Sequence, residues 1–353
     1  MKILYMSSCH SVLEYNDLTM FSELGWDWFS TGFYMRPTQI DPFFSRRPAI
    51  NKHIDENLIV EFRKANPTYT PHDLTRRNIK LTKSLVDKFD VIFCNAFDHY
   101  VIDNWDLIKN KLVIWRTYSD QTPRIERGMK FYVDNGAIPV RGSQNEHTGV
   151  EDSNAGVVIR CYVDESIFKG WKGGNYSVLS FQNYFKSRRK YETTKNFLEL
   201  RNRMSTYTFD VYGAHSSEEK DPVVISEVSF EQQVKHLQDY RVYFSIGSFP
   251  ASVTYNFIEA WMTGIPVVTF GDKLGGSDFE GQKSLYEVPG LIDFGKNGIY
   301  SDDLNSLQYY IKEIMNNDAL VAGLSKEGRD RAIELFGKET IKKQWKDLIE
   351  ELI

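Results

Sequence analysis

Short apolar runs alternate with amphipathic stretches along most of the chain, and this alternation predicts strands and helices in turn. The apolar runs that predict strands lie at residues 2–6, 91–94, 112–116, 176–181, 208–212, 242–246 and 267–270. Amphipathic stretches predict helices near residues 80–89, 190–203, 230–238 and 338–353. Strands that alternate with helices form parallel sheets covered on both faces. We therefore expect an α/β protein with doubly wound parallel sheets.

The length of the chain predicts more than one domain. Its 353 residues exceed what one hydrophobic core commonly serves, and a hydrophobic content of 41% can fill two cores. We expect two doubly wound, Rossmann-like domains. The boundary is expected within residues 155–175, where an apolar stretch gives way to the glycine-rich KGGN. The predicted ranges are a first domain over residues 1–160, a second over 161–337 and a terminal helix over 338–353.

Charge and cysteine content exclude several classes of protein. The net charge of −5 gives no basic field of the kind that drives non-specific nucleic-acid binding, so we expect no nucleic-acid partner. The cysteines Cys9, Cys94 and Cys161 are far apart and share no metal-ligand spacing, which argues against a disulfide scaffold and structural zinc. No apolar run is long enough to span a membrane. These observations favour a protein of the reducing cytoplasm.

Residues 241–271, RVYFSIGSFPASVTYNFIEAWMTGIPVVTFG, form the most informative segment of the chain. An apolar run, a glycine-bearing loop, a helical stretch and a second apolar run predict a strand, loop, helix and strand. Ser252 is a candidate N-cap of the helix, and Gly264 followed by Pro266 predicts its end.

The predicted helix offers a site for a nucleoside diphosphate. Free backbone N–H groups at its start favour an anion, so a phosphate is expected near Ser252, Thr254 and Tyr255. Glu259 lies one turn further along, beside the apolar stripe, within reach of sugar hydroxyls. The alternative is an ordinary β-α-β unit with a solvated glutamate.

The sequence SFPASVTYNFIEAWMTGIPVVTFG resembles the signature of the family 4 type glycosyltransferases of GT-B fold, whose pattern ends in a helix of the form EAMAxGxPVV. The resemblance implies that Glu259 binds the ribose hydroxyls of a nucleoside-diphosphate sugar, with backbone amides before it holding the diphosphate. It also implies two domains that face each other across a cleft, an acceptor-binding first domain, a terminal helix that crosses back to it, and retention of anomeric configuration. Ala251 departs from the family, which usually has a glutamate there that contacts the donor sugar.

A second group of candidate donor-site residues is basic and follows the strand predicted at 176–181. Cations at the carboxyl end of a strand face the cleft of an α/β domain and stabilise a departing diphosphate. The resemblance assigns the segment to the basic phosphate-binding loop of the family, and which residue takes that role stays open. A solvated basic loop is the alternative for each. The residues are Lys186, Arg188, Arg189 and Lys190.

Between these two segments, residues 209–240 resemble the strand, glycine turn and base-holding segment of the family. The resemblance places Gly213 and Val228 nearest the nucleotide base. Backbone atoms usually read the base there, so uridine and guanosine donors both stay open.

Three residues of the first domain are candidates for catalysis because they follow predicted strands, where loops carry acceptor chemistry. His10 follows the first strand, Asp98 follows the strand at 91–94, and Arg116 ends the strand at 112–116. Arg116 is costly to bury unless it meets an anion. A structural role is the alternative for His10, and an ion pair for Arg116.

The sequence contains no Asp-x-Asp and no histidine–glutamate pair at zinc-protease spacing, so we expect metal-independent chemistry with no cofactor besides the donor substrate. The predicted function is transfer of a sugar from a UDP or GDP donor to a glycan or lipid-linked hydroxyl acceptor. The alternatives are a non-catalytic sugar-nucleotide-binding scaffold, motivated by Ala251, and a sugar-nucleotide epimerase of the same fold. The aromatic and basic segment 26–48 leaves peripheral contact with the inner membrane face open.

Overall fold

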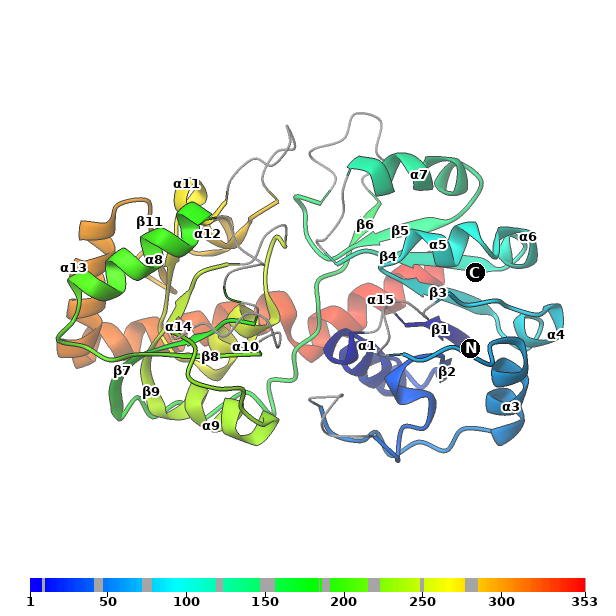
Figure 1. Ribbon diagram of the computed structural model, residues 1–353, viewed down its shortest axis with the longest axis horizontal. Helices are drawn as coiled ribbons and strands as arrows, with labels where there is room; N and C mark the ends of the chain where they lie inside the picture. Colours follow the sequence, from blue (N-terminus) through cyan, green and yellow to red (C-terminus); the bar gives the residue numbers. More distant parts are fainter. Residues whose placement is uncertain are drawn as a thin grey trace. The chain divides into compact units, whose positions relative to one another are not determined.

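The computed structural model describes residues 1–7, 10–40, 47–71, 78–118, 123–146, 156–183, 185, 191–214, 223–247, 251–276 and 285–352. Within this part of the chain there are two compact units, which we call unit 1 (Met1–Tyr162 with Ile341–Ile353) and unit 2 (Val163–Thr340). Each unit contains a parallel β-sheet with helices packed on it (Figure 1). The expected α/β class with two parallel sheets is therefore confirmed.

The described sheet of unit 1 has the strand order β2-β1-β3-β4-β5-β6, and its strands run parallel. The strands are β1 (Lys2–Met6), β2 (Asp27–Ser30), β3 (Val91–Asn95), β4 (Leu112–Arg116), β5 (Ile138–Arg141) and β6 (Val157–Val158). Central strand β3 is buried at every residue, which explains its unbroken apolar run. The sequence pattern predicted β1, β3 and β4. It missed β2, β5 and β6, which are too short or too polar to give a clear signal.

The helices of unit 1 are α1 (Ser11–Glu23), α3 (Glu56–Ala65), α4 (Lys83–Val86), α5 (Asp98–Ile102), α6 (Trp105–Ile108), α7 (Pro123–Asp134) and, from Ile341 onward, α15 (Lys338–Leu352), with a 3-10 turn η1 (Phe33–Met35). Helix α4 is shorter than the predicted 80–89. The amide groups of Asn66 and Asn104 hydrogen-bond the backbone of residues 79–81 and hold it outside the helix. Side-chain bonds to the backbone here compete successfully with helix formation.

Helix α15 packs into the core of unit 1, although it lies at the far end of the sequence. Its buried face carries Ile341, Trp345, Leu348 and Ile349. The ring centre of Trp345 lies 6.1 Å from that of Phe21 and 5.6 Å from that of Phe93. Edge-on and tilted aromatic contacts of this kind fix the position of a helix as well as burying apolar surface.

The described sheet of unit 2 has the order β11-β10-β9-β7-β8, again with parallel strands. The strands are β7 (Asn175–Phe181), β8 (Phe209–Tyr212), β9 (Tyr240–Ser245), β10 (Val267–Phe270) and β11 (Ile299–Ser301). The first four were predicted from their apolar runs. Strand β11 was missed because its three residues are too few to give a pattern.

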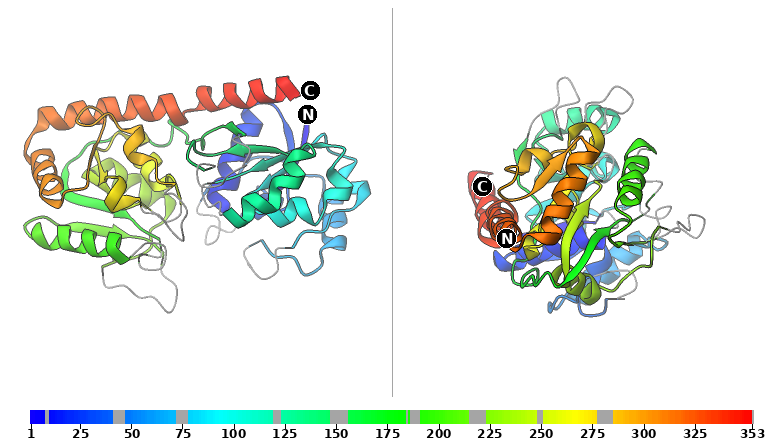
Figure 2. Two further views of the ribbon diagram at one scale, coloured as in Figure 1. Left: turned by 90° about the horizontal axis from the view of Figure 1, so that it is seen from above. Right: turned by 90° about the vertical axis from the view of Figure 1, so that its left-hand side faces the viewer.

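The helices of unit 2 are α8 (Tyr191–Arg203), α9 (Phe230–Asp239), α10 (Tyr255–Thr263), α11 (Asp272–Gly275), α12 (Val288–Leu291), α13 (Leu304–Asn316) and α14 (Asp318–Phe336). Helix α10 packs on α14 and α9, while α8 packs on α13. Figure 2 shows α8 and α14 on opposite sides of the sheet, so both of its faces are covered.

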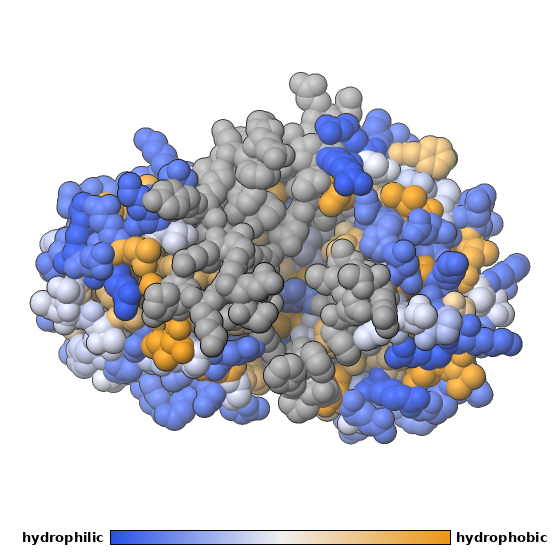
Figure 3. Space-filling model, viewed as in Figure 1, coloured by the Kyte–Doolittle hydropathy of each residue, from blue (hydrophilic) through white to orange (hydrophobic). Residues whose placement is uncertain are grey.

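Hydrophilic residues cover most of the described surface visible in Figure 3, and hydrophobic residues appear there in small groups. In the described residues we find no helix that combines the length and the apolar character needed to cross a membrane.

Candidate functional site

Unit 2 has a topological switch point between β7 and β9. Strand β7 is flanked by β8 on one side and β9 on the other, so the segments after β7 and after β9 leave the sheet in opposite directions. Doubly wound α/β proteins bind ligands outside the carboxyl ends of the strands at such a point. Helix α10, which carries the predicted nucleotide-binding glutamate, follows β9 directly.

The start of α10 lies two residues later than the sequence indicated. The side chain of Thr254, and not that of Ser252, accepts a hydrogen bond from the backbone N–H of Phe257 (3.3 Å) and caps the helix. Ser252 is fully buried, and its carbonyl accepts from the N–H of Glu287 at 3.0 Å. The predicted cap at Ser252 was therefore wrong, because Thr254 caps the helix and the Ser252 carbonyl bonds to Glu287 outside it.

The predicted end of α10 is confirmed. Gly264 is the C-cap and has a φ of 91°, in the left-handed region that favours glycine.

Glu259 is buried in the middle of α10, with 1% of its surface exposed. Its Oε2 atom accepts a hydrogen bond of 2.5 Å from Nε2 of Gln233 on α9. The alternative of a solvated glutamate is therefore wrong. A carboxylate removed from water needs specific donors, so a buried glutamate beside a switch point is a candidate ligand-binding group.

Gly213 lies where the end of β8 meets the end of β7. A Cβ atom there would be 2.2 Å from the carbonyl oxygen of Gln182, so only glycine allows this approach. The next residue, Ala214, donates its N–H to Oδ1 of Asn183 (2.9 Å). The segments after β7 and β8 are thus joined beside the switch point.

Val228 is half-buried and directly precedes Ser229, the N-cap of α9. The basic candidates Lys186, Arg188, Arg189 and Lys190 lie outside the described residues.

The sheet of unit 1 has an equivalent switch point between β1 and β3. His10 is exposed and stands at the N-cap position of α1, which follows β1, without capping it through its side chain. Asp98 begins α5, which follows β3, and its Oδ1 accepts from the backbone N–H of His99 at 2.9 Å. Both candidates therefore lie in segments that leave the carboxyl ends of the two central strands.

The backbone is strained beside Asp98. Ala96 has a φ of 63°, although it is not a glycine, and its N–H donates to the carbonyl of Arg116 at 2.8 Å. Strained residues of this kind occur often at functional sites.

Arg116, the third candidate, is completely buried. Its Nη1 donates to the carbonyl oxygens of Arg141 (3.0 Å) and Ile159, and its guanidinium lies 4.9 Å from the ring centre of Tyr118. Its Nε finds no hydrogen-bond partner among the described residues. Burial alone would lower the pKa of Arg116, but Tyr118 and nearby acidic groups, among them Asp17, raise it. The described contacts suit a cation that holds the ends of neighbouring strands.

Two buried carboxylates on α1, Glu14 and Asp17, were not identified as site residues from the sequence. Glu14 accepts from the hydroxyls of Ser7 (2.7 Å) and Ser30 and from the backbone N–H groups of Phe33 (3.0 Å) and Tyr34 (2.8 Å). Burial raises the pKa of Glu14, and these hydrogen bonds oppose the rise. The contacts fasten the segment after β1 to the segment after β2.

Asp17 accepts hydrogen bonds from the hydroxyls of Tyr5 (2.9 Å) and Tyr118, and Asn95 donates to both of these hydroxyls. Burial raises the pKa of Asp17, and Arg116 opposes the rise. This network joins α1 to the ends of β1, β3 and β4. The sequence offered one clue, two acids three residues apart on a predicted helix, but such a pair is equally typical of a solvent-exposed helix face.

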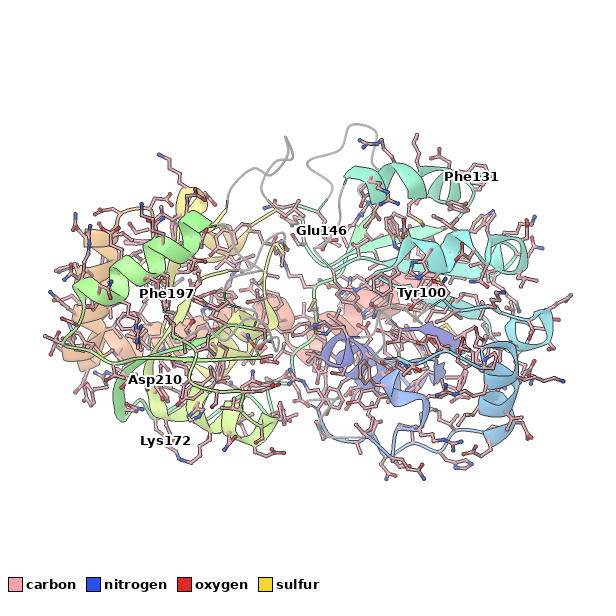
Figure 4. All side chains as sticks on the ribbon, in the orientation of Figure 1. Tyr100, Phe131, Glu146, Lys172, Phe197 and Asp210 are labelled. Atoms are coloured by element: carbon pink, nitrogen blue, oxygen red, sulfur yellow. The ribbon has the colours of Figure 1, made fainter. Side chains whose placement is uncertain are left out.

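Two side chains labelled in Figure 4 extend the contacts at this edge of unit 1. The hydroxyl of Tyr100 donates to the carbonyl of Ser7 (2.7 Å). Glu146 accepts from the N–H of Gly142 (2.9 Å) and from the hydroxyl of Thr117. In the described part of the chain, no group of three or more histidine, cysteine or acidic side chains is arranged to hold a metal ion.

No family model matches the chain. A curated relative, the poly(ribitol-phosphate) alpha-N-acetylglucosaminyltransferase of Staphylococcus aureus (strain COL), is 28% identical over 152 residues. The match covers 40% of this chain and 28% of the relative, so the chain spans little more than a quarter of the length of that protein.

Several solved structures share the fold. The Anabaena protein HepE in complex with UDP-glucose superposes with a TM-score of 0.64 at 13% identity, covering 99% of this chain and all of that one. A glycosyltransferase from Rickettsia africae gives a TM-score of 0.63 at 11% identity over 99% of this chain and 98% of that one. TarM gives 0.54 at 16% identity over 73% of this chain and 54% of its own. These similarities confirm the two-sheet GT-B fold.

Proposed function

We propose that the protein is a glycosyltransferase that moves a sugar from a nucleoside-diphosphate donor to a hydroxyl acceptor. The observation that carries the proposal is Glu259, a buried carboxylate on the helix that follows β9 at the switch point of unit 2. A carboxylate accepts hydrogen bonds from two neighbouring hydroxyls, which a ribose presents. The GT-B fold and the partial match to an N-acetylglucosaminyltransferase support the same function.

The donor in this proposal is a UDP-sugar bound by unit 2. Glu259 binds the ribose, and the segment that holds Gly213 and Val228 contacts the base. The start of α10, from Ser252 through Thr254 to Tyr255, offers backbone N–H groups to the diphosphate. Lys186, Arg188 or Arg189 neutralises the departing phosphate. The choice of uridine draws on HepE, which has been solved with UDP-glucose.

The proposed reaction needs no metal and retains the anomeric configuration, in keeping with the resemblance to family 4 type enzymes. The barrier falls because the helix start and the cations stabilise the charge that develops on the leaving diphosphate. Unit 1 binds the acceptor, with His10 and Asp98 beside the acceptor hydroxyl and Arg116 holding the strand ends behind them. In this proposal the acceptor is a glycan or a lipid-linked hydroxyl, and the protein is cytoplasmic and acts at the inner face of the membrane.

The first test is a thermal-shift panel of UDP, GDP, CMP and dTDP on the wild type and on Glu259→Gln. A nucleotide at about 100 times its dissociation constant adds about 2.7 kcal/mol of stability. We expect UDP to raise the melting temperature of the wild type and to lose most of this effect in Glu259→Gln, which keeps the volume of the side chain. Absence of a shift with any nucleotide contradicts the proposal.

A sugar-nucleotide-binding scaffold without turnover is the second candidate, because Ala251 stands where the family usually has a donor-contacting glutamate. Release of UDP from UDP-glucose and UDP-N-acetylglucosamine in the presence of glycan and polyol-phosphate acceptors separates the two. A glycosyltransferase releases UDP and forms a glycosylated product, whereas a scaffold binds the donor and leaves it intact.

A further inference from the structure

Two reciprocal hydrogen bonds fix the first turn of helix α9. The hydroxyl of Ser229 accepts from the backbone N–H of Gln232 (3.2 Å), and the Gln232 side chain accepts in return from the backbone N–H of Ser229 (2.9 Å). The backbone N–H of Gln233 donates to the carbonyl of Ser229 at 2.9 Å. A capping box of this kind fixes the start of a helix, so the backbone of Gln233 has a defined position.

The side chain of Gln233 reaches from this turn to α10. Its Nε2 donates to Oε2 of Glu259 at 2.5 Å. The amide thus presents its nitrogen to the carboxylate, which is the arrangement that leaves no two oxygens set against each other. This hydrogen bond restricts the rotation of the Glu259 carboxyl group.

We propose that Gln233 is a positioning residue that sets the orientation in which Glu259 accepts hydrogen bonds from the ribose hydroxyls of the donor. This inference rests on the proposed function, because it assigns a role to a neighbour of the ribose-binding carboxylate. Hydroxyl recognition depends on the direction of the accepting lone pairs, so a carboxylate whose rotation Gln233 restricts discriminates better than one that rotates.

The same turn carries the segment proposed to contact the base. Val228 directly precedes the N-cap Ser229, and Gln233 lies one turn beyond it. Recognition of the base and of the ribose therefore depends on one rigid turn of α9. Gln233 contributes to the preference for ribose over deoxyribose without touching the nucleotide.

The test compares the dissociation constants of UDP and 2′-deoxy-UDP by titration calorimetry. The variants are Gln233→Leu, which removes the donor, and Gln233→Asn, which keeps the amide but is one methylene too short. Gln238→Leu is the matched control, because Gln238 lies on the same helix and donates to the carbonyl of Lys169 at 2.8 Å instead. Loss of one hydrogen bond to a charged group corresponds to about tenfold or more in affinity.

We expect the wild type and Gln238→Leu to prefer UDP over 2′-deoxy-UDP by about tenfold or more. In Gln233→Leu and Gln233→Asn the preference should fall below about threefold, chiefly through weaker binding of UDP. Combining Gln233→Leu with Glu259→Gln should lower the preference no further than Glu259→Gln alone, because both changes remove one arrangement.

Melting curves of the unliganded variants accompany the titrations, and Gln233→Asn carries the test if Gln233→Leu does not fold. An unchanged preference in the Gln233 variants overturns the inference and leaves the proposed function intact. Equal loss in Gln238→Leu also overturns it, because the effect would then reflect loosening of α9. A wild type that binds neither nucleotide overturns the proposed function together with the inference.

Discussion

At the scale of single residues, three buried carboxylates lie on the helices that follow the two switch points. Glu14 and Asp17 lie on the helix after β1, and Glu259 lies on the helix after β9. All three are buried, with 0%, 6% and 1% of their surfaces exposed. Buried carboxylates destabilise a fold unless donors surround them, so their presence points to positions where shape or binding requires a negative group.

Glu14 should make stability depend on pH. Burial raises its pKa in the folded protein above the ordinary value of 4.5, so the folded state holds the proton more tightly than the unfolded state. The stabilisation from that proton is complete below pH 4.5 and is lost as pH rises through the folded pKa. Glu14→Gln lacks this dependence.

The destabilisation caused by Glu14→Gln should therefore be largest near pH 4.5 and shrink toward pH 8. Urea unfolding of both proteins across this range measures it. A difference between the two proteins that grows with pH would show that the folded pKa is not raised.

At the scale of elements, helix α10 carries most of the candidate donor site that the sequence predicted. Its apolar residues anchor it between the sheet and α14, Thr254 caps its start, and its C-cap glycine ends it. The nine-residue helix is short, so its first turn depends on the cap at Thr254.

Substitutions of Thr254 should separate the capping role from anion binding. Thr254→Asp keeps an N-cap and should hold stability within about 0.5 kcal/mol, while Thr254→Ala should cost about 1 kcal/mol. The added charge of Thr254→Asp should weaken UDP about tenfold or more and leave uridine, which has no phosphates, unaffected.

Thermal unfolding and calorimetric titration with UDP and uridine provide the measurements, with Thr254→Ser as the control for a retained hydroxyl. Equal weakening of UDP and uridine by Thr254→Asp would place the diphosphate elsewhere.

Much of the element structure could be predicted, since buried parallel strands are continuous apolar runs. The predictions for β1, β4 and β10 agree with the structure residue for residue. The late start of α4 could not be predicted from the local sequence, because Asn66 and Asn104, which hold residues 79–81 outside the helix, lie elsewhere in the chain.

The candidate site was only partly accessible from the sequence, for the same reason. Glu259 stood out as an acid in an apolar helix. Its partner Gln233 lies 26 residues away on another helix, and no local pattern encodes that contact.

At the scale of the whole molecule, the core of unit 1 depends on α15, a helix far from the rest of that unit in the sequence. Trp345 is 1% exposed and lies against Phe21 and Phe93, and its ring centre is 5.6 Å from the guanidinium of Arg116. The helix therefore completes the core of unit 1 and adds a cation–π contact to a candidate residue.

Trp345→Ala should destabilise unit 1 by about 3–5 kcal/mol, through lost burial and the cavity that remains. Unit 2 should keep its stability, because Trp345 packs in the core of unit 1. Hydrogen exchange followed by mass spectrometry resolves the two units, and Lys343→Ala, on the exposed face of the same helix, is the control. Equal loss of protection in both units would contradict this assignment.

The division of the chain has a consequence for the order of events during synthesis. Unit 2 is one continuous segment, Val163–Thr340, inserted between the two pieces of unit 1. A ribosome releases residues in chain order, so unit 2 has its full sequence before the part of α15 that packs in unit 1 leaves the exit tunnel. The surface of Phe21 and Phe93 is therefore synthesised well before the helix whose Trp345 packs on it. The earlier piece of unit 1 must therefore keep an unfinished aromatic core from associating with other chains until α15 has been synthesised.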